Sequence, residues 1–151
     1  MIRGCHTHVQ SVERSALVRY TPGQMLALVG DVERYPEFLP WCVSASVQPV
    51  REGEVIATVE VARSVLRTRF ATRNVIEPDG RLRMTLESGP FRALQGEWRF
   101  DPIGTQGARV TFHIDFEFDN RLLAAALNAA FESICSTLVN AFADRARAVY
   151  G

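Results

Sequence analysis

Residues 110–142, VTFHIDFEFDNRLLAAALNAAFESICSTLVNAF, decide the fold, because their hydrophobic pattern changes period once, at Asn120. Before Asn120, from Val110 to Asp119, apolar and polar side chains alternate, which is the pattern of a strand with one buried face. After it, apolar residues recur every three or four positions, which indicates an amphipathic helix. The apolar stripe of this helix consists of Leu123, Leu127, Phe131, Ile134, Leu138 and Phe142.

The predicted helix runs from about Arg121 to Val149, a length of roughly 43 Å at 1.5 Å per residue. A folded chain of 151 residues has a radius of gyration of roughly 15 Å, so the helix must cross the whole domain. Glu132 is the only charged residue between Leu122 and Ala143. We therefore expect the outer face of the helix to contact a second copy of the protein, forming a homodimer, or a membrane surface.

The chain before this stretch alternates between helical and extended signals. Residues 12–20 favour a strand, and Thr21 and Pro22 are typical of a helix N-cap and first turn, in a helix that Gly30 ends. A second short helical turn is expected over residues 33–39, and successive antiparallel strands follow up to Asn120. This order predicts an α+β fold in which a curved antiparallel sheet surrounds one long helix and leaves a gap for an apolar ligand.

Composition indicates one domain, residues 11–151, after a loose N-terminal extension at residues 1–10. The chain has 151 residues, of which 47% are hydrophobic and 23% charged, enough to bury a core without a metal or disulfide. It has no apolar run of the length that spans a membrane and no signal-peptide pattern at its start. We expect a cytoplasmic protein that contacts the inner membrane transiently, at its periphery.

The charge is balanced, with 17 basic and 17 acidic residues, which argues against strong overall attraction to nucleic acid. All the basic residues are Arg, and residues 63–109 carry a local excess of them. Arg67, Arg69 and Arg73 fall on one face of a predicted strand, together with Arg63. This Arg stripe suits phosphate contacts with RNA, and its alternative is a solvated sheet face with carboxylates on neighbouring strands.

Neither a metal nor an organic cofactor is expected. Cys5, Cys42 and Cys135 are too widely spaced for a zinc site or a paired disulfide framework. His6 and His8 lie two residues apart but lack further ligands nearby.

We also expect no catalytic activity. The acidic residues considered as proton donors or acceptors, Asp31, Glu33, Glu37 and Glu97, accompany no nucleophile motif, phosphate loop or metal set. His113 falls in the polar row of the last strand, which predicts a surface histidine.

Several short segments together carry a family resemblance. They are DVERYPEFLPWC (31–42), FATRN (70–74), GPFRALQGEWRF (89–100), FEF (116–118), AFADRA (141–146) and VYG (149–151). With them, the chain resembles the coenzyme Q-binding START-domain family, which overlaps with the bacterial ribosome-association toxin family within the START-like superfamily of polyketide cyclases, dehydrases and lipid transporters. The resemblance implies a helix-grip fold over residues 11–151.

The same resemblance implies two different functions, which the motifs do not separate. One is non-enzymatic binding of an isoprenoid lipid, above all ubiquinone, as a carrier or chaperone for respiratory electron transport or quinone biosynthesis. The alternative is a ribosome-association inhibitor that binds the large ribosomal subunit and blocks subunit joining, for which the Arg stripe would supply the RNA contacts.

For the lipid, the sequence offers four large apolar side chains within residues 35–41, whose backbone Pro36 and Pro40 restrict, and we interpret them as a lid over the mouth of the sheet. Their alternative role is to cap the core. The predicted ligand-lining residues are Phe38, Leu39, Trp41, Phe70, Phe91, Leu94, Trp98, Phe131, Ile134 and Leu138.

Overall fold

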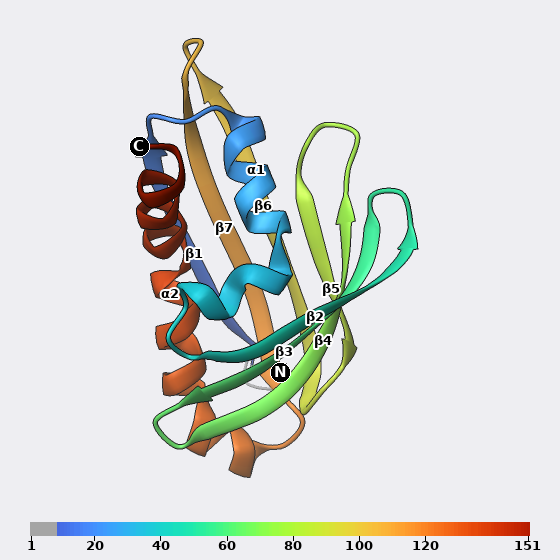
Figure 1. The fold of residues 1–151 in the computed structure, drawn as a ribbon. Helices are drawn as coiled ribbons and strands as arrows, with labels where there is room; N and C mark the ends of the chain where they lie inside the picture. The colour runs from blue at the N-terminus through green and yellow to red at the C-terminus, as the bar shows by residue number, and fades with distance from the viewer. Residues whose placement is uncertain (1–8) are drawn as a thin grey trace, which may run out of the picture.

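Seven antiparallel strands form one curved sheet in the order β1-β7-β6-β5-β4-β3-β2 (Figure 1). The computed structural model describes residues 9–151. The strands are β1 (Gln10–Val18), β2 (Cys42–Arg51), β3 (Glu54–Arg63), β4 (Leu66–Ile76), β5 (Leu82–Ser88), β6 (Phe91–Ile103) and β7 (Gly107–Phe118). From β2 to β7 each strand pairs with the next one in the chain, which confirms the predicted meander.

β1 joins the sheet beside β7, so the first and last strands of the chain are neighbours. Gln10 already pairs with Phe116, so β1 begins one residue before the predicted boundary. The rest of the predicted extension, residues 1–8, lies outside the described residues.

The long helix α2 (Arg121–Tyr150) begins where the sequence pattern changes period. The Asn120 side chain caps it by accepting a hydrogen bond from the backbone N–H of Leu123 at 2.9 Å. The helix packs against β1 and β7, and its stripe residues Phe131, Ile134 and Phe142 are buried. Along the first half of α2 the outward face is apolar and exposed, with Leu122 82% exposed.

Among residues 9–151, α2 is also the one helix long and apolar enough to cross a membrane, with a mean hydropathy of 1.6. That property is weak evidence for a membrane span, because the core helix of a soluble domain has the same length and composition. In this fold the apolar stripe of α2 contributes to the core.

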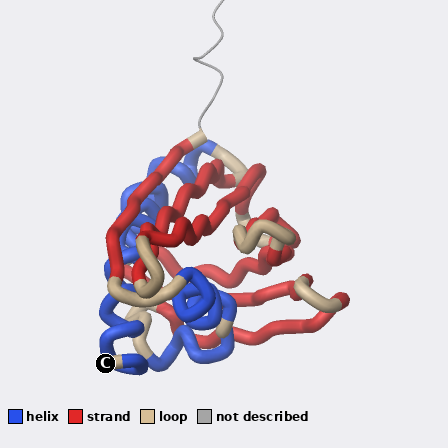
Figure 2. The backbone as a smooth tube through the Cα atoms, turned by 90° about the horizontal axis from the view of Figure 1, so that it is seen from above, coloured by secondary structure: helices blue, strands red, loops and turns tan. Residues whose placement is uncertain are grey.

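Two short helical segments cover the end of the sheet next to α2. The helix α1 (Pro22–Gly30) has a complete capping box, in which Gln24 N donates to Thr21 Oγ1 at 3.1 Å and Thr21 N donates to Gln24 Oε1 at 2.8 Å. The 3-10 turn η2 (Val32–Glu37) follows and contacts β2. Seen from above, helices and strands enclose the interior between them (Figure 2).

The pairing between β5 and β6 is the shortest in the sheet. It joins only residues 82–85 to residues 95–98, whereas β6 pairs with β7 along most of its length. Beyond these pairs, residues 86–88 of β5 pair with β4 and residues 91–94 of β6 pair with β7, and the turn between the two strands contains Gly89, with φ of +142°. Phe91 and Leu94, which follow this turn, are buried in the core.

Candidate functional site

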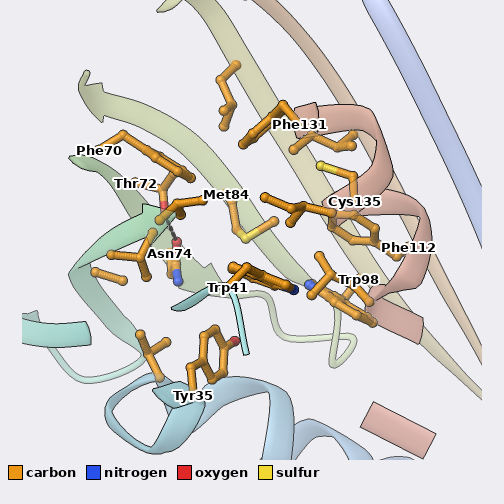
Figure 3. A pocket seen from close by; sticks show the side chains of 18 of the residues that line it. Tyr35, Trp41, Phe70, Thr72, Asn74, Met84, Trp98, Phe112, Phe131 and Cys135 are labelled. Carbon is orange, nitrogen blue, oxygen red and sulfur yellow. Dashed lines mark hydrogen bonds between the residues drawn. The ribbon is translucent and has the colours of Figure 1, made fainter. Parts of the chain in front are cut away.

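An apolar cavity of about 90 Å³ lies in the hollow between α2, η2 and the inner face of the sheet (Figure 3). It is smaller than the roughly 300–1,000 Å³ of a typical small-molecule site, so a ligand of ordinary size would have to widen it. Its walls are Val32, Tyr35, Trp41, Ala57, Val59, Val61, Phe70, Thr72, Asn74, Met84, Leu94, Trp98, Phe112, Ile114, Phe131, Ile134, Cys135, Leu138 and Phe142.

Most of the residues predicted to line a ligand cavity do surround this one. They are Trp41, Phe70, Leu94, Trp98, Phe131, Ile134 and Leu138. Strands β4 and β6 supply three of them from inward-facing positions, and α2 supplies three from its stripe. Trp41 lies just after η2 and is 9% exposed, so its ring forms part of the wall.

The structure places Phe38, Leu39 and Phe91 outside the cavity lining, contrary to the prediction. Phe38 packs edge-on against Phe142, with ring centroids 5.2 Å apart. Leu39 is 1% exposed in the core, and Phe91 stacks on Phe118 with centroids 4.6 Å apart. All three lie in or beside turns, where the alternation of a strand does not determine which way a side chain points.

The turn η2 is held against α2 by Arg145. Its guanidinium donates to Glu37 Oε1 at 2.8 Å and lies 4.7 Å from the centroid of the Phe38 ring, a cation–π contact. On the inner side of the same turn, the Tyr35 hydroxyl donates to the carbonyl of Val29. Burial raises the pKa of the Tyr35 hydroxyl, so it stays protonated as the donor of this bond. These contacts fix the wall of the cavity on the side of η2.

Two polar side chains in the cavity, Thr72 and Asn74, were missed by the sequence prediction. They occupy the inward row of β4 and are 7% and 6% exposed. The Thr72 hydroxyl donates to Asn74 Oδ1 at 2.6 Å (Figure 3). The signal that could have revealed them is the row Phe70, Thr72, Asn74 and Ile76, where two polar residues interrupt an apolar face.

Cys135 contributes a buried thiol to the wall from α2. Desolvation raises the pKa of this thiol, which therefore remains protonated and a poor nucleophile. Cys42 is likewise a free, buried cysteine, while Cys5, His6 and His8 lie outside the described residues.

On the outer face of the sheet, two members of the predicted Arg stripe have carboxylate partners on neighbouring strands. Arg73 Nη1 lies 2.5 Å from Glu54 Oε2, and Arg73 Nη2 lies 3.4 Å from Glu87 Oε1. The hydrogen bond to Glu54 raises the pKa of Arg73. Arg69 pairs with Glu60 at 3.4 Å, whereas Arg67 has no ion pair among residues 9–151.

Arg63 does not share the face of Arg67, contrary to the prediction. The chain reverses between β3 and β4 at a tight turn in which Ser64 has φ of +55°. Arg63 pairs with Leu66, which is buried, and Ala62 pairs with Arg67. Because paired residues point to the same side of a sheet, Arg63 lies at the end of the inner row.

His113 lies on the outer face, as predicted, with both ring nitrogens near carboxylates. Nδ1 is 3.2 Å from Glu13 Oε1, and Nε2 is 3.1 Å from Asp115 Oδ1. Within residues 9–151, no group of three His, Cys, Asp or Glu side chains is arranged to hold a metal ion. The acidic residues considered for catalysis lie outside the cavity lining, and Glu97 pairs with Arg81.

A long helix packed across a curved antiparallel sheet, with an apolar cavity between them, defines a helix-grip domain. The chain belongs to the polyketide cyclase/dehydrase and lipid transport family, whose model matches residues 18–143. The superfamily predicted from the sequence motifs is thereby confirmed. The Zhui aromatase/cyclase from Streptomyces sp. R1128 shares the fold, with a TM-score of 0.82 over 93% of this chain and 94% of that one, at 17% identity.

Two relatives carry the two functional names that the motifs left open. The chain is 41% identical over 145 residues to the ribosome association toxin RatA of Pseudomonas aeruginosa, covering 96% of this chain and 99% of that protein. It is 29% identical over 142 residues to the coenzyme Q-binding protein COQ10 homolog B, mitochondrial, of Xenopus laevis, covering 91% of this chain and 58% of that protein. The chain is therefore more similar to the ribosome association toxin, over nearly the whole of that protein.

Proposed function

We propose that this protein acts on ribosome association in the cytoplasm, by binding the large ribosomal subunit and blocking its joining to the small one. The observation that carries the proposal is the 41% identity to a ribosome association toxin over 99% of that protein's length. The lower identity to the coenzyme Q-binding relative, 29%, also favours ribosome association over quinone binding. Quinone binding, the first of the two functions that the family resemblance implied, thereby becomes the second candidate.

Arg67 and Arg69, on the outer face of β4, are the proposed contacts with ribosomal RNA. Arg67 has no ion pair within residues 9–151, and Arg69 pairs only with the exposed Glu60. Exposed ion pairs are worth about 0–1 kcal/mol, so an RNA phosphate competes readily for such a guanidinium. Arg73, held between Glu54 and Glu87, is less available.

Sucrose-gradient sedimentation of ribosomal subunits mixed with purified protein tests this proposal. Added protein should lower the fraction of whole ribosomes and sediment with the large subunit, and rising salt should weaken that association steeply. The double variant Arg67→Gln/Arg69→Gln should lose it. Arg147→Gln is the matched control, because Arg147 is equally exposed but lies on α2, and it should sediment like the wild type.

Two results would count against this proposal. Unchanged gradients at a molar excess of protein would reject the function. Unchanged cosedimentation of the double variant would reject this surface and leave the function standing on the identity alone.

As a second candidate function, we propose that the cavity binds an isoprenoid quinone such as ubiquinone without catalysing a reaction. The lining supports it, because the walls are almost entirely aliphatic and aromatic. At about 90 Å³ the cavity is smaller than the roughly 150 Å³ that holds benzene, so the ring would widen the space and the tail would extend through the mouth.

Mass spectrometry of an organic extract of the purified protein tests this candidate. An isoprenoid quinone in the extract supports it. If the extract contains no isoprenoid quinone and added ubiquinone leaves the melting temperature unchanged, quinone binding is rejected.

A further inference from the structure

The Asn74 amide presents hydrogen-bond donors to the cavity. Its acceptor end is in use, because Oδ1 accepts the bond from Thr72. Its donor end is not, because Nδ2 has no hydrogen bond to any residue in the range 9–151. Figure 3 shows this nitrogen turned away from Thr72, on the side of Trp41 and Tyr35. Asn74 is 6% exposed, so the little surface that it keeps faces the cavity.

This arrangement leaves hydrogen-bonding capacity unused at the cavity wall. Leu, which is close to Asn in size, would fill the same place without any polar group that needs a partner. The indole N–H groups of Trp41 and Trp98 add two further donors to the lining that have no acceptor in the described chain. No carboxylate lines the cavity. The unused hydrogen-bonding capacity of these three side chains is therefore donor capacity.

We propose that Asn74 determines the specificity of this cavity, and that the ligand is an apolar ring bearing a carbonyl oxygen, which accepts a hydrogen bond from Asn74 Nδ2. Thr72 is a positioning residue, because its bond to Oδ1 keeps the N–H groups directed into the cavity. An apolar protein cavity of about 150 Å³ binds benzene, whereas this one measures about 90 Å³, so the cavity must widen when such a ring binds. The inference rests on the second candidate function and adds the chemical group that is recognised and the residue that recognises it.

A matched pair of small ligands tests the proposal. Duroquinone and durene are the same tetramethyl six-membered ring with and without two carbonyl oxygens, and the methyl groups block addition of thiols such as Cys135. Calorimetric titration should show that the wild-type protein binds duroquinone at least ten-fold more tightly than durene. Asn74→Leu should abolish this preference while durene still binds, and Thr72→Val should reduce it.

Equal affinity of the wild type for the two ligands, retention of the preference in Asn74→Leu, or failure of the wild type to bind either ligand would overturn the proposal. Thermal melting checks that each variant folds. If Asn74→Leu does not fold, Asn74→Ala gives the same answer, because alanine also removes the N–H groups. Binding of duroquinone without binding of ubiquinone would reject the isoprenoid function and keep this one, and the ribosome experiment is independent of both.

Discussion

Gly89 approaches Phe70 so closely that a Cβ built on the glycine would lie 2.5 Å from the Phe70 Cβ and 3.2 Å from its Cα. The φ of Gly89, +142°, is also one that other residues rarely adopt. Phe70 in turn lines the cavity and packs edge-on against Phe131, with ring centroids 5.8 Å apart. The connection between β5 and β6 therefore depends on the absence of a side chain at residue 89.

Gly89→Ala should lower the free energy of unfolding by about 1–3 kcal/mol, because the added methyl group overlaps backbone-bound atoms and the φ is strained. Urea denaturation measures it. Gly23→Ala is the control, since a Cβ at that position in α1 meets nothing within 4 Å. It should be neutral or stabilising by up to about 1 kcal/mol. Equal effects of the two substitutions would contradict the close approach.

Leu138→Ala and Leu39→Ala remove the same atoms from two different surroundings. Leu39 is 1% exposed and lies outside the cavity lining, so its truncation should cost about 2–5 kcal/mol. Leu138 is half-buried at the cavity wall and has fewer protein partners to lose, so its truncation should cost less than about 2 kcal/mol. Urea unfolding of both variants gives the comparison. A larger loss of unfolding free energy for Leu138→Ala than for Leu39→Ala would show that Leu138 packs in a filled core and not at a cavity wall.

Arg73→Gln should lower the melting temperature, because it leaves the carboxylate of Glu54, whose side chain is 13% exposed, without its closest partner. Arg67→Gln should leave the melting temperature unchanged, because Arg67 has no ion pair within residues 9–151. Differential scanning calorimetry distinguishes the two. The same shift in both variants would mean that the two side chains contribute equally to the fold.

Asp115 makes stability depend on pH. The Ser11 hydroxyl donates to Asp115 Oδ1 at 2.5 Å, and this bond, helped by His113, lowers the pKa of the carboxyl group. The charged form is therefore favoured by folding. The stabilisation that this charged carboxylate provides is fully present above the ordinary Asp pKa of about 3.9. It disappears as the pH falls through the lower pKa that Asp115 has in the folded protein.

Asp115→Asn should accordingly destabilise the protein at neutral pH. The difference from the wild type should shrink as the pH falls below about 4. Urea denaturation at a series of pH values measures both. A difference that stays constant down to the acid limit would exclude this carboxylate as its source.

The main features of the fold were predictable because they depend on local patterns. The change of period at Asn120, the Thr21 and Pro22 cap, and the meander punctuated by glycine turns all appear in the structure. The turn between β3 and β4 was not predicted, because it uses Ser64 with φ of +55° where a glycine or asparagine would have marked it. That one missed turn placed Arg63 on the wrong face.

The candidate site was predictable in its aromatic walls and not in its polar centre. Phe70 and Trp98 lie in apolar rows of strands, and alternation alone points them inward. Asn74 lies in the same kind of row, but nothing local indicates that a polar side chain faces a cavity, because the cavity is formed by elements that are distant in sequence. The surrounding space becomes visible only when β4 is seen opposite α2.

The short ladder between β5 and β6 has a consequence for how molecules reach the interior. Amide hydrogens exchange fastest where few backbone bonds must break, so those that bond β5 to β6, within residues 82–85 and 95–98, should exchange ahead of those between β6 and β7. β5 stays bonded to β4 and β6 to β7, so opening parts the sheet in the middle instead of fraying an edge. Met84, Leu94 and Trp98 border this line and also line the cavity. We therefore expect that separation of β5 from β6 would expose the cavity while α2 and the Arg145 contact stay in place.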